Sequence, residues 1–278
     1  MDHFSYRGMT FPVDDSGPSD ADAGHTVVLL HGFPETRASW QDVAARLNDA
    51  GLRTLAPDLR GLPASARPRR RRDYRVERLV EDVHALLDAA GLPSAHLVGH
   101  DWGGGVAWEA ALRRPDRVRS LTALTTPHPS AMLWSLARSA QGLRSWYMLA
   151  VQVPRLPEAL FAWGLQREGL QSLDLPEKYR VAFEEQLRKP GAITGALAPY
   201  RALLLWPSPH TTRSHGAVAV PTTYVWSRHD PYLGPRAARR TAHYCTGPYR
   251  FVEADADHWL PEKHPDLVAD VVLDRVAG

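Results

Sequence analysis

The chain has 278 residues, 44% of them hydrophobic, which is enough to bury a large core in one α/β unit or in two smaller domains. It carries 33 basic and 31 acidic residues spread along its length, and this balance gives no reason to expect nucleic acid or an anionic membrane as a partner. Its single cysteine, Cys245, excludes an intrachain disulfide and a thiolate metal site. No basic segment leads into an apolar run at the N-terminus, and no apolar stretch reaches membrane-spanning length, so we predict a soluble cytoplasmic protein.

The first half of the chain alternates between strand and helix patterns. Residues 1–20 combine alternating apolar positions with turn residues, which predicts an antiparallel pair at a sheet edge. The elements that follow are a continuous apolar strand at 26–30, a helix at about 39–50, a strand at 53–58, a helix from Val76 to Ala90, a short strand at Leu97 and a strand at 119–125. Because parallel strands joined by helices give right-handed crossover units, this alternation predicts a mostly parallel sheet.

The pattern changes between Pro127 and Gly216, where aromatic residues and prolines accompany helical stretches without strand runs. Such a segment is typical of a helical insertion that covers a site. The α/β rhythm then returns with strands at 222–226 and 249–253 and helices at 235–245 and 265–276. We therefore divide the chain into a first core part (1–127), a helical cap (128–216) and a second core part (217–278).

One glycine-rich stretch carries a catalytic signature. Gly99-His100-Asp101-Trp102-Gly103 matches the nucleophile-elbow pattern G-x-S-x-G, with Asp101 in place of the serine. The glycines permit a sharp, strained turn from strand to helix. A carboxylate is a weak nucleophile that suits displacement at an activated sp³ carbon, and the ester it forms must then be hydrolysed. The stretch therefore predicts a nucleophile that needs a water-activating base elsewhere in the chain.

Further candidates follow other strands. In an open parallel sheet the chemistry gathers at the carboxyl ends of the strands, and His31, Asp101, Asp230 and His258 all occupy such ends. The order Asp101, Asp230, His258 is the nucleophile–acid–histidine order of one hydrolase fold. Taken alone, Asp230 could equally cap the helix after it, and only its placement distinguishes His258 from the other histidines.

These motifs together resemble a known family. They are His31-Gly32-Phe33-Pro34-Glu35, Gly99-His100-Asp101-Trp102-Gly103-Gly104, Asp230-Pro231-Tyr232-Leu233-Gly234 and His258-Trp259. The chain resembles the α/β-hydrolase superfamily, and more closely its epoxide hydrolases, from about residue 4 to residue 273. The resemblance implies an α/β-hydrolase fold with a mostly parallel central sheet, helices on both faces and a helical cap insertion.

The resemblance also implies roles for individual residues. Asp101 would form an alkyl-enzyme ester, His258 would activate the water that hydrolyses it, and Asp230 would orient the imidazole. The backbone N–H groups of Phe33 and Trp102 would form the oxyanion hole.

Epoxide opening also needs a proton donor, and epoxide hydrolases place two cap tyrosines there. The matching residues are Tyr147 and Tyr200, although both could instead be packing aromatics of the cap. Tyrosine suits the role because it stays neutral at pH 7 and can donate to an alkoxide. We expect the pocket to be completed by His31, Pro34, His100, His128 and Trp259, with His128 acting as a hinge or support.

The sequence thus predicts an epoxide hydrolase that needs no cofactor or metal and converts a small-molecule epoxide and water to a vicinal diol. A haloalkane dehalogenase is the nearest alternative, but Phe33 supplies no side-chain N–H for a halide. A non-catalytic ligand-binding member of the fold is a second alternative. The missing elbow serine disfavours an esterase, and no H-E-x-x-H or comparable spacing indicates a metal site. The oligomeric state and the physiological epoxide stay open.

Overall fold

A computed structural model describes residues 1–205 and 216–278 of the chain. Its centre is an eight-stranded sheet with the order β1-β2-β4-β3-β5-β6-β7-β8. The strands are β1 (His3–Tyr6), β2 (Met9–Ser16), β3 (Thr26–Leu30), β4 (Arg53–Pro57), β5 (Ala95–His100), β6 (Val118–Leu124), β7 (Thr222–Ser227) and β8 (Tyr249–Ala254). The β1–β2 and β2–β4 pairs are antiparallel and all other pairs are parallel, which confirms the predicted sheet and its antiparallel edge.

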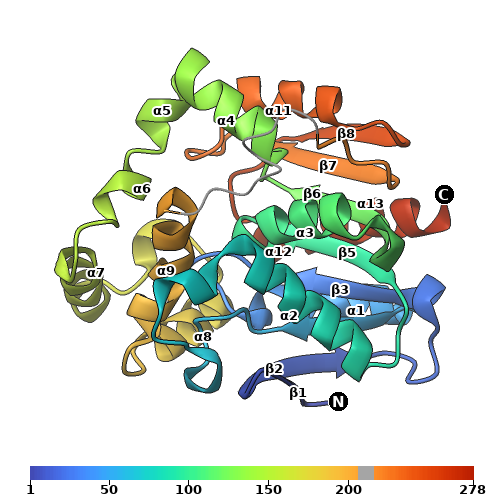
Figure 1. Cartoon of the computed structure of the whole chain (residues 1–278), viewed down its shortest axis with the longest axis horizontal. Helices are drawn as coiled ribbons and strands as arrows, with labels where there is room; N and C mark the ends of the chain where they lie inside the picture. The colour runs from blue at the N-terminus through green and yellow to red at the C-terminus, as the bar shows by residue number, and fades with distance from the viewer. Residues whose placement is uncertain (206–215) are drawn as a thin grey trace.

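Helices cover both faces of this sheet (Figure 1). The α-helices of the described residues are α1 (Gln41–Asp49), α2 (Val76–Ala89), α3 (Trp102–Arg113), α4 (Pro129–Arg138), α5 (Gln141–Arg144), α6 (Tyr147–Ala150), α7 (Leu156–Arg167), α8 (Glu177–Leu187), α9 (Ala192–Leu205), α11 (Pro235–Arg240), α12 (Leu260–Lys263) and α13 (Pro265–Ala277). Short 3₁₀ helices occur at Ala23–His25, Arg37–Trp40, Ala64–Ala66, Arg71–Tyr74, Pro115–Arg117, Gln171–Leu173 and Thr241–Tyr244.

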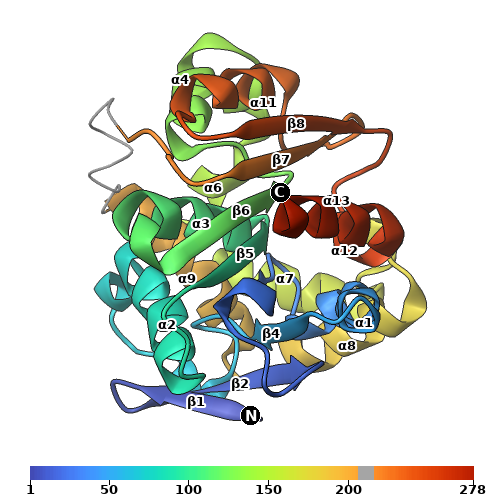
Figure 2. The ribbon, with the colours of Figure 1, turned by 90° about the vertical axis from the view of Figure 1, so that its right-hand side faces the viewer.

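The sheet separates two hydrophobic cores. Figure 2 shows α2 and α3 on one face and α1 and α13 on the other. Every residue of β3, β4 and β5 is buried, which explains why β3 carries a continuous apolar run rather than an alternating pattern. Successive side chains point to opposite faces, so that Val28 and Leu30 join the core under α2 and α3, and Val27 and Leu29 join the core under α1 and α13.

The predicted elements occur at their predicted places, with differences at their ends. The helix expected at 39–50 begins as the 3₁₀ turn Arg37–Trp40, whose N-cap Thr36 accepts a hydrogen bond from the Ala38 N–H. The helix expected at 235–245 is shorter than predicted, since α11 gives way to a 3₁₀ turn at Thr241–Tyr244. The hydrogen bonds of the terminal turn decide whether a helix begins or ends as α or 3₁₀, and the spacing of apolar residues does not reveal them.

Helices α4 to α9 lie between β6 and β7 in the sequence, and Figure 1 shows α5, α6 and α7 along one outer side of the molecule. This arrangement agrees with a helical insertion, while the exact domain limits at 128 and 216 stay a prediction. Residues 206–215, which belong to the expected cap, lie outside the described residues.

Candidate active site

Asp101 occupies a strained turn between β5 and α3. Its φ of 47° and ψ of −115° lie in a region that side chains rarely adopt. The flanking glycines make the turn possible, because a Cβ at Gly99 would overlap the Gly103 carbonyl and a Cβ at Gly103 would overlap the Leu30 carbonyl. The Thr126 hydroxyl donates a hydrogen bond to the Asp101 carbonyl oxygen at 2.8 Å and fixes the turn from the next strand end. The local sequence therefore forces one side chain out at the edge of the sheet.

The three residues expected to act together converge at this edge. His258 Nδ1 lies 2.7 Å from Asp230 Oδ2, and His258 Nε2 lies 3.9 Å from Asp101 Oδ2. The other oxygen of Asp230, Oδ1, accepts hydrogen bonds from the backbone N–H groups of Tyr232 and Leu233 at 2.7 and 2.9 Å. Burial raises the pKa of Asp230, but the charge and hydrogen bond of His258 and the two N–H groups outweigh burial and lower it below its ordinary value. Asp230 is thus a buried, ionised partner for His258.

Backbone donors surround the Asp101 carboxylate. The Phe33 N–H, on the loop after β3, donates to Asp101 Oδ1 at 3.0 Å. Trp102 is the first residue of α3, so its N–H has no partner within the helix. Burial raises the pKa of Asp101, and the charges of His258 and His100 together with the Phe33 N–H oppose this rise. The side chain keeps 18% exposure, so the carboxylate can still be reached.

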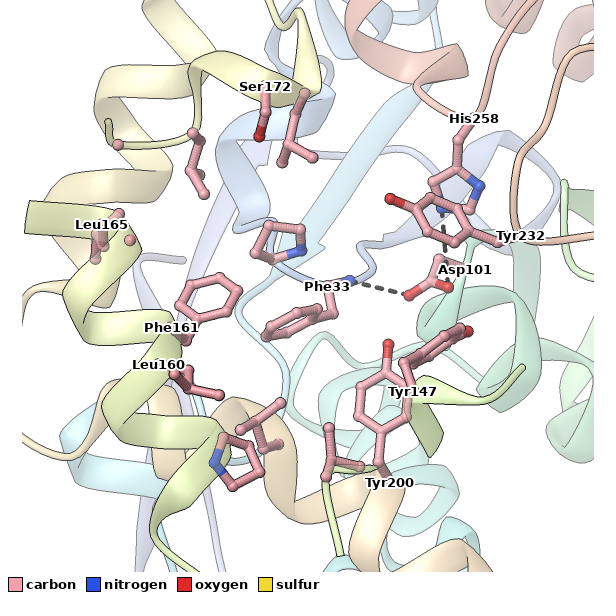
Figure 3. Close-up of a pocket in the computed structure, with 18 of the residues that line it drawn as sticks. Phe33, Asp101, Tyr147, Leu160, Phe161, Leu165, Ser172, Tyr200, Tyr232 and His258 are labelled. Atoms are coloured by element: carbon pink, nitrogen blue, oxygen red, sulfur yellow. Dashed lines mark hydrogen bonds and ion pairs between the residues drawn. The ribbon is translucent and has the colours of Figure 1, made fainter. Parts of the chain in front are cut away.

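A cavity of about 440 Å³ opens over Asp101 (Figure 3). It is bounded on the core side by Asp101 and His258 and elsewhere mainly by apolar groups of the α4–α9 segment. The lining residues are Phe33, Pro34, Asp101, Tyr147, Val151, Pro157, Leu160, Phe161, Gly164, Leu165, Gly169, Leu170, Ser172, Leu173, Leu197, Tyr200, Tyr232, His258 and Trp259.

Tyr147 and Tyr200 face Asp101 across this cavity, with their hydroxyl ends turned toward the carboxylate in Figure 3. Their rings pack edge to face with centroids 6.0 Å apart, and the Tyr200 ring also packs on Trp102 at 4.8 Å. Burial, followed by the charge of Asp101, raises the pKa of both hydroxyl groups above the ordinary value. Both tyrosines therefore stay protonated donors at neutral pH.

Of the five other residues expected at the pocket, Pro34 and Trp259 line the cavity and three histidines do not. His31 is buried behind the loop, where its Nε2 accepts a hydrogen bond from the Leu59 N–H at 2.9 Å. His128 caps α4 by accepting from the Ser130 N–H, and its ring stacks on Tyr244. Their places in the sequence suggested a pocket role, but both side chains are buried and hydrogen-bonded to backbone N–H groups away from the cavity.

His100, the third histidine, lies beneath the site. Its Nδ1 lies 2.7 Å from Glu35 Oε1, and its Nε2 donates to the His258 carbonyl oxygen at 2.9 Å. Burial lowers the pKa of His100, but the Glu35 carboxylate overcomes it and raises the pKa to about 10. Glu35 in turn accepts from the Gly32 N–H at 2.8 Å. This buried ion pair joins the loop of Phe33 to the loop of His258.

Two features escaped the sequence reasoning. Tyr232 lines the cavity, and its ring contacts both Tyr147 and His258, with centroids 6.1 and 5.0 Å away. Its place two residues after Asp230, at the end of a strand, could have indicated this. Glu262 is buried near Glu35, and no sequence signal indicated that two distant acids would meet under one site.

Residues 1–205 and 216–278 carry neither a metal-ligand cluster nor a membrane-spanning helix. No group of three or more His, Cys, Asp or Glu side chains is arranged there to hold a metal ion. Within the same residues, no helix combines the length and the apolar character needed to cross a bilayer.

Comparisons with known proteins identify the family of the chain. The family model described as alpha/beta hydrolase fold matches residues 25–265. Epoxide hydrolase A of Mycobacterium tuberculosis is 32% identical over 98% of this chain and 95% of its own length. Epoxide hydrolase 3 of Xenopus tropicalis is 33% identical over 89% of this chain and 70% of its own length. The crystal structure of epoxide hydrolase A from Mycobacterium thermoresistibile aligns with a TM-score of 0.81 at 27% identity, covering 99% of this chain and 97% of that one. The chain therefore belongs to the α/β-hydrolase superfamily and, within it, to the epoxide hydrolase family.

Proposed function

We propose that the chain hydrolyses small apolar epoxides to vicinal diols through an ester on Asp101. The observation that carries this proposal is the placement of Asp101 between His258 Nε2, 3.9 Å away, and two protonated tyrosines across an apolar cavity. A nucleophile, a base and an acid thus surround one space that can hold the ring of an epoxide. The crystal structure of a Bacillus megaterium epoxide hydrolase mutant with its naphthyloxy-propanediol product shows a diol bound in another protein of this fold.

The first step opens the ring. An Asp101 carboxylate oxygen attacks one epoxide carbon and forms a C–O ester bond, while the bond from that carbon to the ring oxygen breaks. The ring oxygen keeps the electron pair and takes a proton from Tyr200 or Tyr147. The raised pKa keeps these hydroxyl groups protonated, and the alkoxide can still take their proton because it is a stronger base than tyrosinate.

The second step hydrolyses the ester. His258 Nε2 removes a proton from water, and the hydroxide adds to the ester carbonyl of Asp101. The N–H groups of Phe33 and Trp102 stabilise the oxyanion, which collapses to release the diol and the Asp101 carboxylate. Asp230 holds the imidazolium through Nδ1 until its proton returns to the tyrosinate through solvent.

A parallel assay with a terminal aryl epoxide, a bromoalkane and an activated ester tests this function. We expect diol formation alone. Halide release alone would instead support the dehalogenase alternative, and no product with any substrate would support a ligand-binding protein. Asp101→Asn in a homogeneous preparation should abolish steady turnover. Steady turnover by this variant would contradict the mechanism.

The intermediate can be observed directly. In His258→Gln the water loses its base, so the ester should accumulate and raise the protein mass by the mass of the epoxide. If no mass increase is found after prolonged incubation while epoxide is still consumed, an ester on Asp101 is contradicted.

The cytoplasmic location, the cap limits at 128–216 and the pocket-support role of His128 stay predictions from the sequence.

A further inference from the structure

The outer side of the cap carries an apolar surface that the fold does not need. Of the eleven large hydrophobic side chains exposed in the described parts of the chain, eight lie between Leu133 and Trp163, so the exposure is local rather than general. Six of them define what we call the cap patch: Leu143, Trp146, Leu149, Leu156, Leu160 and Trp163. Concentrated exposure of this kind marks an interaction site more often than scattered single residues do.

The cap patch follows the helical period. Leu156, Leu160 and Trp163 lie at i, i+4 and i+7 on α7 and are each more than half exposed. The other face of α7 carries Phe161 and Leu165, which line the cavity. The helix is therefore apolar on both sides, and its inner side supplies most of its contribution to the cavity wall.

Leu143 on α5, Trp146 at the N-cap of α6 and Leu149 on α6 continue the surface, since all three side chains are exposed. Figure 1 shows α5, α6 and α7 following one another along the same outer side. Leu160 belongs both to the cap patch and to the cavity wall, so the patch borders the cavity.

The charges around the cap patch are mostly positive. Four exposed arginines accompany it: Arg138, Arg144, Arg155 and Arg167. Between residues 129 and 168 the acids are Glu158, which is already bound by two guanidinium nitrogens of Arg201 at 2.6 and 2.9 Å, and the exposed Glu168 at the end of α7. The Arg167 guanidinium lies 4.8 Å above the Trp163 ring, which places a cation beside the apolar surface.

This charge pattern discriminates between occupants. Two copies joined patch to patch would bring eight guanidinium groups into one interface, with only the two Glu168 carboxylates to set against them. An anionic lipid surface offers phosphates to the arginines and an apolar layer to the leucines and tryptophans. Tryptophan and arginine also suit this boundary, since each has an apolar body and a polar end.

We propose that the cap patch docks on an anionic lipid surface. Its Leu and Trp side chains enter the boundary between headgroups and acyl chains, and its arginines contact the phosphates. The cavity behind Leu160 then lies next to the apolar layer, where lipophilic small molecules are most concentrated. The near-neutral charge of the whole chain gave no reason to expect a membrane partner. It does not reveal that arginines gather around the cap patch, because it averages over all faces of the molecule.

Vesicle co-sedimentation of the full chain tests the proposal. At low salt we expect binding to phosphatidylcholine vesicles that contain phosphatidylglycerol, weaker binding to phosphatidylcholine alone, and a loss of the difference at high salt. The variant Leu143→Gln/Leu149→Gln/Trp163→Gln should bind at least about tenfold more weakly, because three apolar groups no longer enter the lipid. Glutamine is a good helix former, and none of the three side chains lines the cavity.

Val181→Gln is the matched control, because Val181 is also an exposed apolar residue of a helix, α8, outside the cap patch. It should bind vesicles like the wild type, and all variants should hydrolyse a water-soluble epoxide equally. Three results would overturn the proposal: no vesicle binding by the wild type, equal binding by the triple variant, or a dimer in light scattering that the triple variant loses while vesicles are not bound. The vesicle assay is independent of the proposed activity, so the two can fail separately.

Discussion

Replacing Asp230 by asparagine separates the two halves of the proposed reaction. Asp230 Oδ1 accepts two backbone hydrogen bonds, from Tyr232 and Leu233, so an amide at this position must place its oxygen there. Its NH₂ group then takes the place of Oδ2, 2.7 Å from His258 Nδ1. Because NH₂ can only donate, Nδ1 must become the acceptor and the imidazole proton must move to Nε2.

The consequence is a base in the wrong tautomer. Nε2 faces Asp101 and has to accept a proton from water, which a protonated Nε2 cannot do. In serine proteases the same change of tautomer lowers the rate about 10⁴-fold, equivalent to about 5 kcal/mol, and we expect a loss of this order in ester hydrolysis. Attack by Asp101 on the epoxide needs no base, so we expect that step to change far less.

Rapid-quench mass spectrometry of the intact Asp230→Asn protein measures both steps in one experiment. We expect one equivalent of ester to form quickly and then to decay slowly. Asp255→Asn is the control, since Asp255 precedes His258 on the same loop but is exposed and pairs only at the surface with His229 and Arg228. Wild-type turnover in Asp230→Asn, or slow turnover without accumulated ester, would refute the reasoning.

Three further predictions concern the acid, the buried carboxyl and the elbow. Tyr200→Phe should slow ring opening about 10²-fold in single-turnover kinetics while leaving ester hydrolysis nearly unchanged, because only the proton donor is lost. Burial and then the charge of Glu35 raise the pKa of Glu262 from 4.5 to about 8. Between these two pKa values the unfolded chain binds fewer protons than the folded one, so the free energy of unfolding of the wild type falls as pH rises. Relative to the wild type, Glu262→Gln should therefore become more stable by up to about 1.4 kcal/mol per pH unit, measured by urea unfolding. A stability difference that does not change with pH would contradict this. Gly103→Ala should abolish soluble expression or lower the unfolding midpoint strongly, because its Cβ overlaps the Leu30 carbonyl, whereas Gly105→Ala, which meets nothing within 4 Å, should be tolerated.

The sequence was sufficient to predict the structure wherever the local residues allow only one conformation. The continuous apolar run of β3 predicted a strand buried on both faces, since a strand with one face in solvent would alternate apolar and polar residues. The glycines around Asp101 admitted only a strained elbow, and the strand order then directed Asp230 and His258 to the same edge.

Only the tertiary structure decided what lies behind and above that edge. His31, His100 and His128 stand beside motif residues in the sequence, but the direction of each side chain depends on packing between elements that are far apart in the chain. Glu35 and Glu262 meet because α12 packs against the 3₁₀ turn Arg37–Trp40 that follows Glu35, and no sequence spacing encodes that contact. The exposed face of α7 is the clearest case: its apolar period looks the same whether the helix is buried or not, and only the fold shows that one of its two apolar faces is left uncovered.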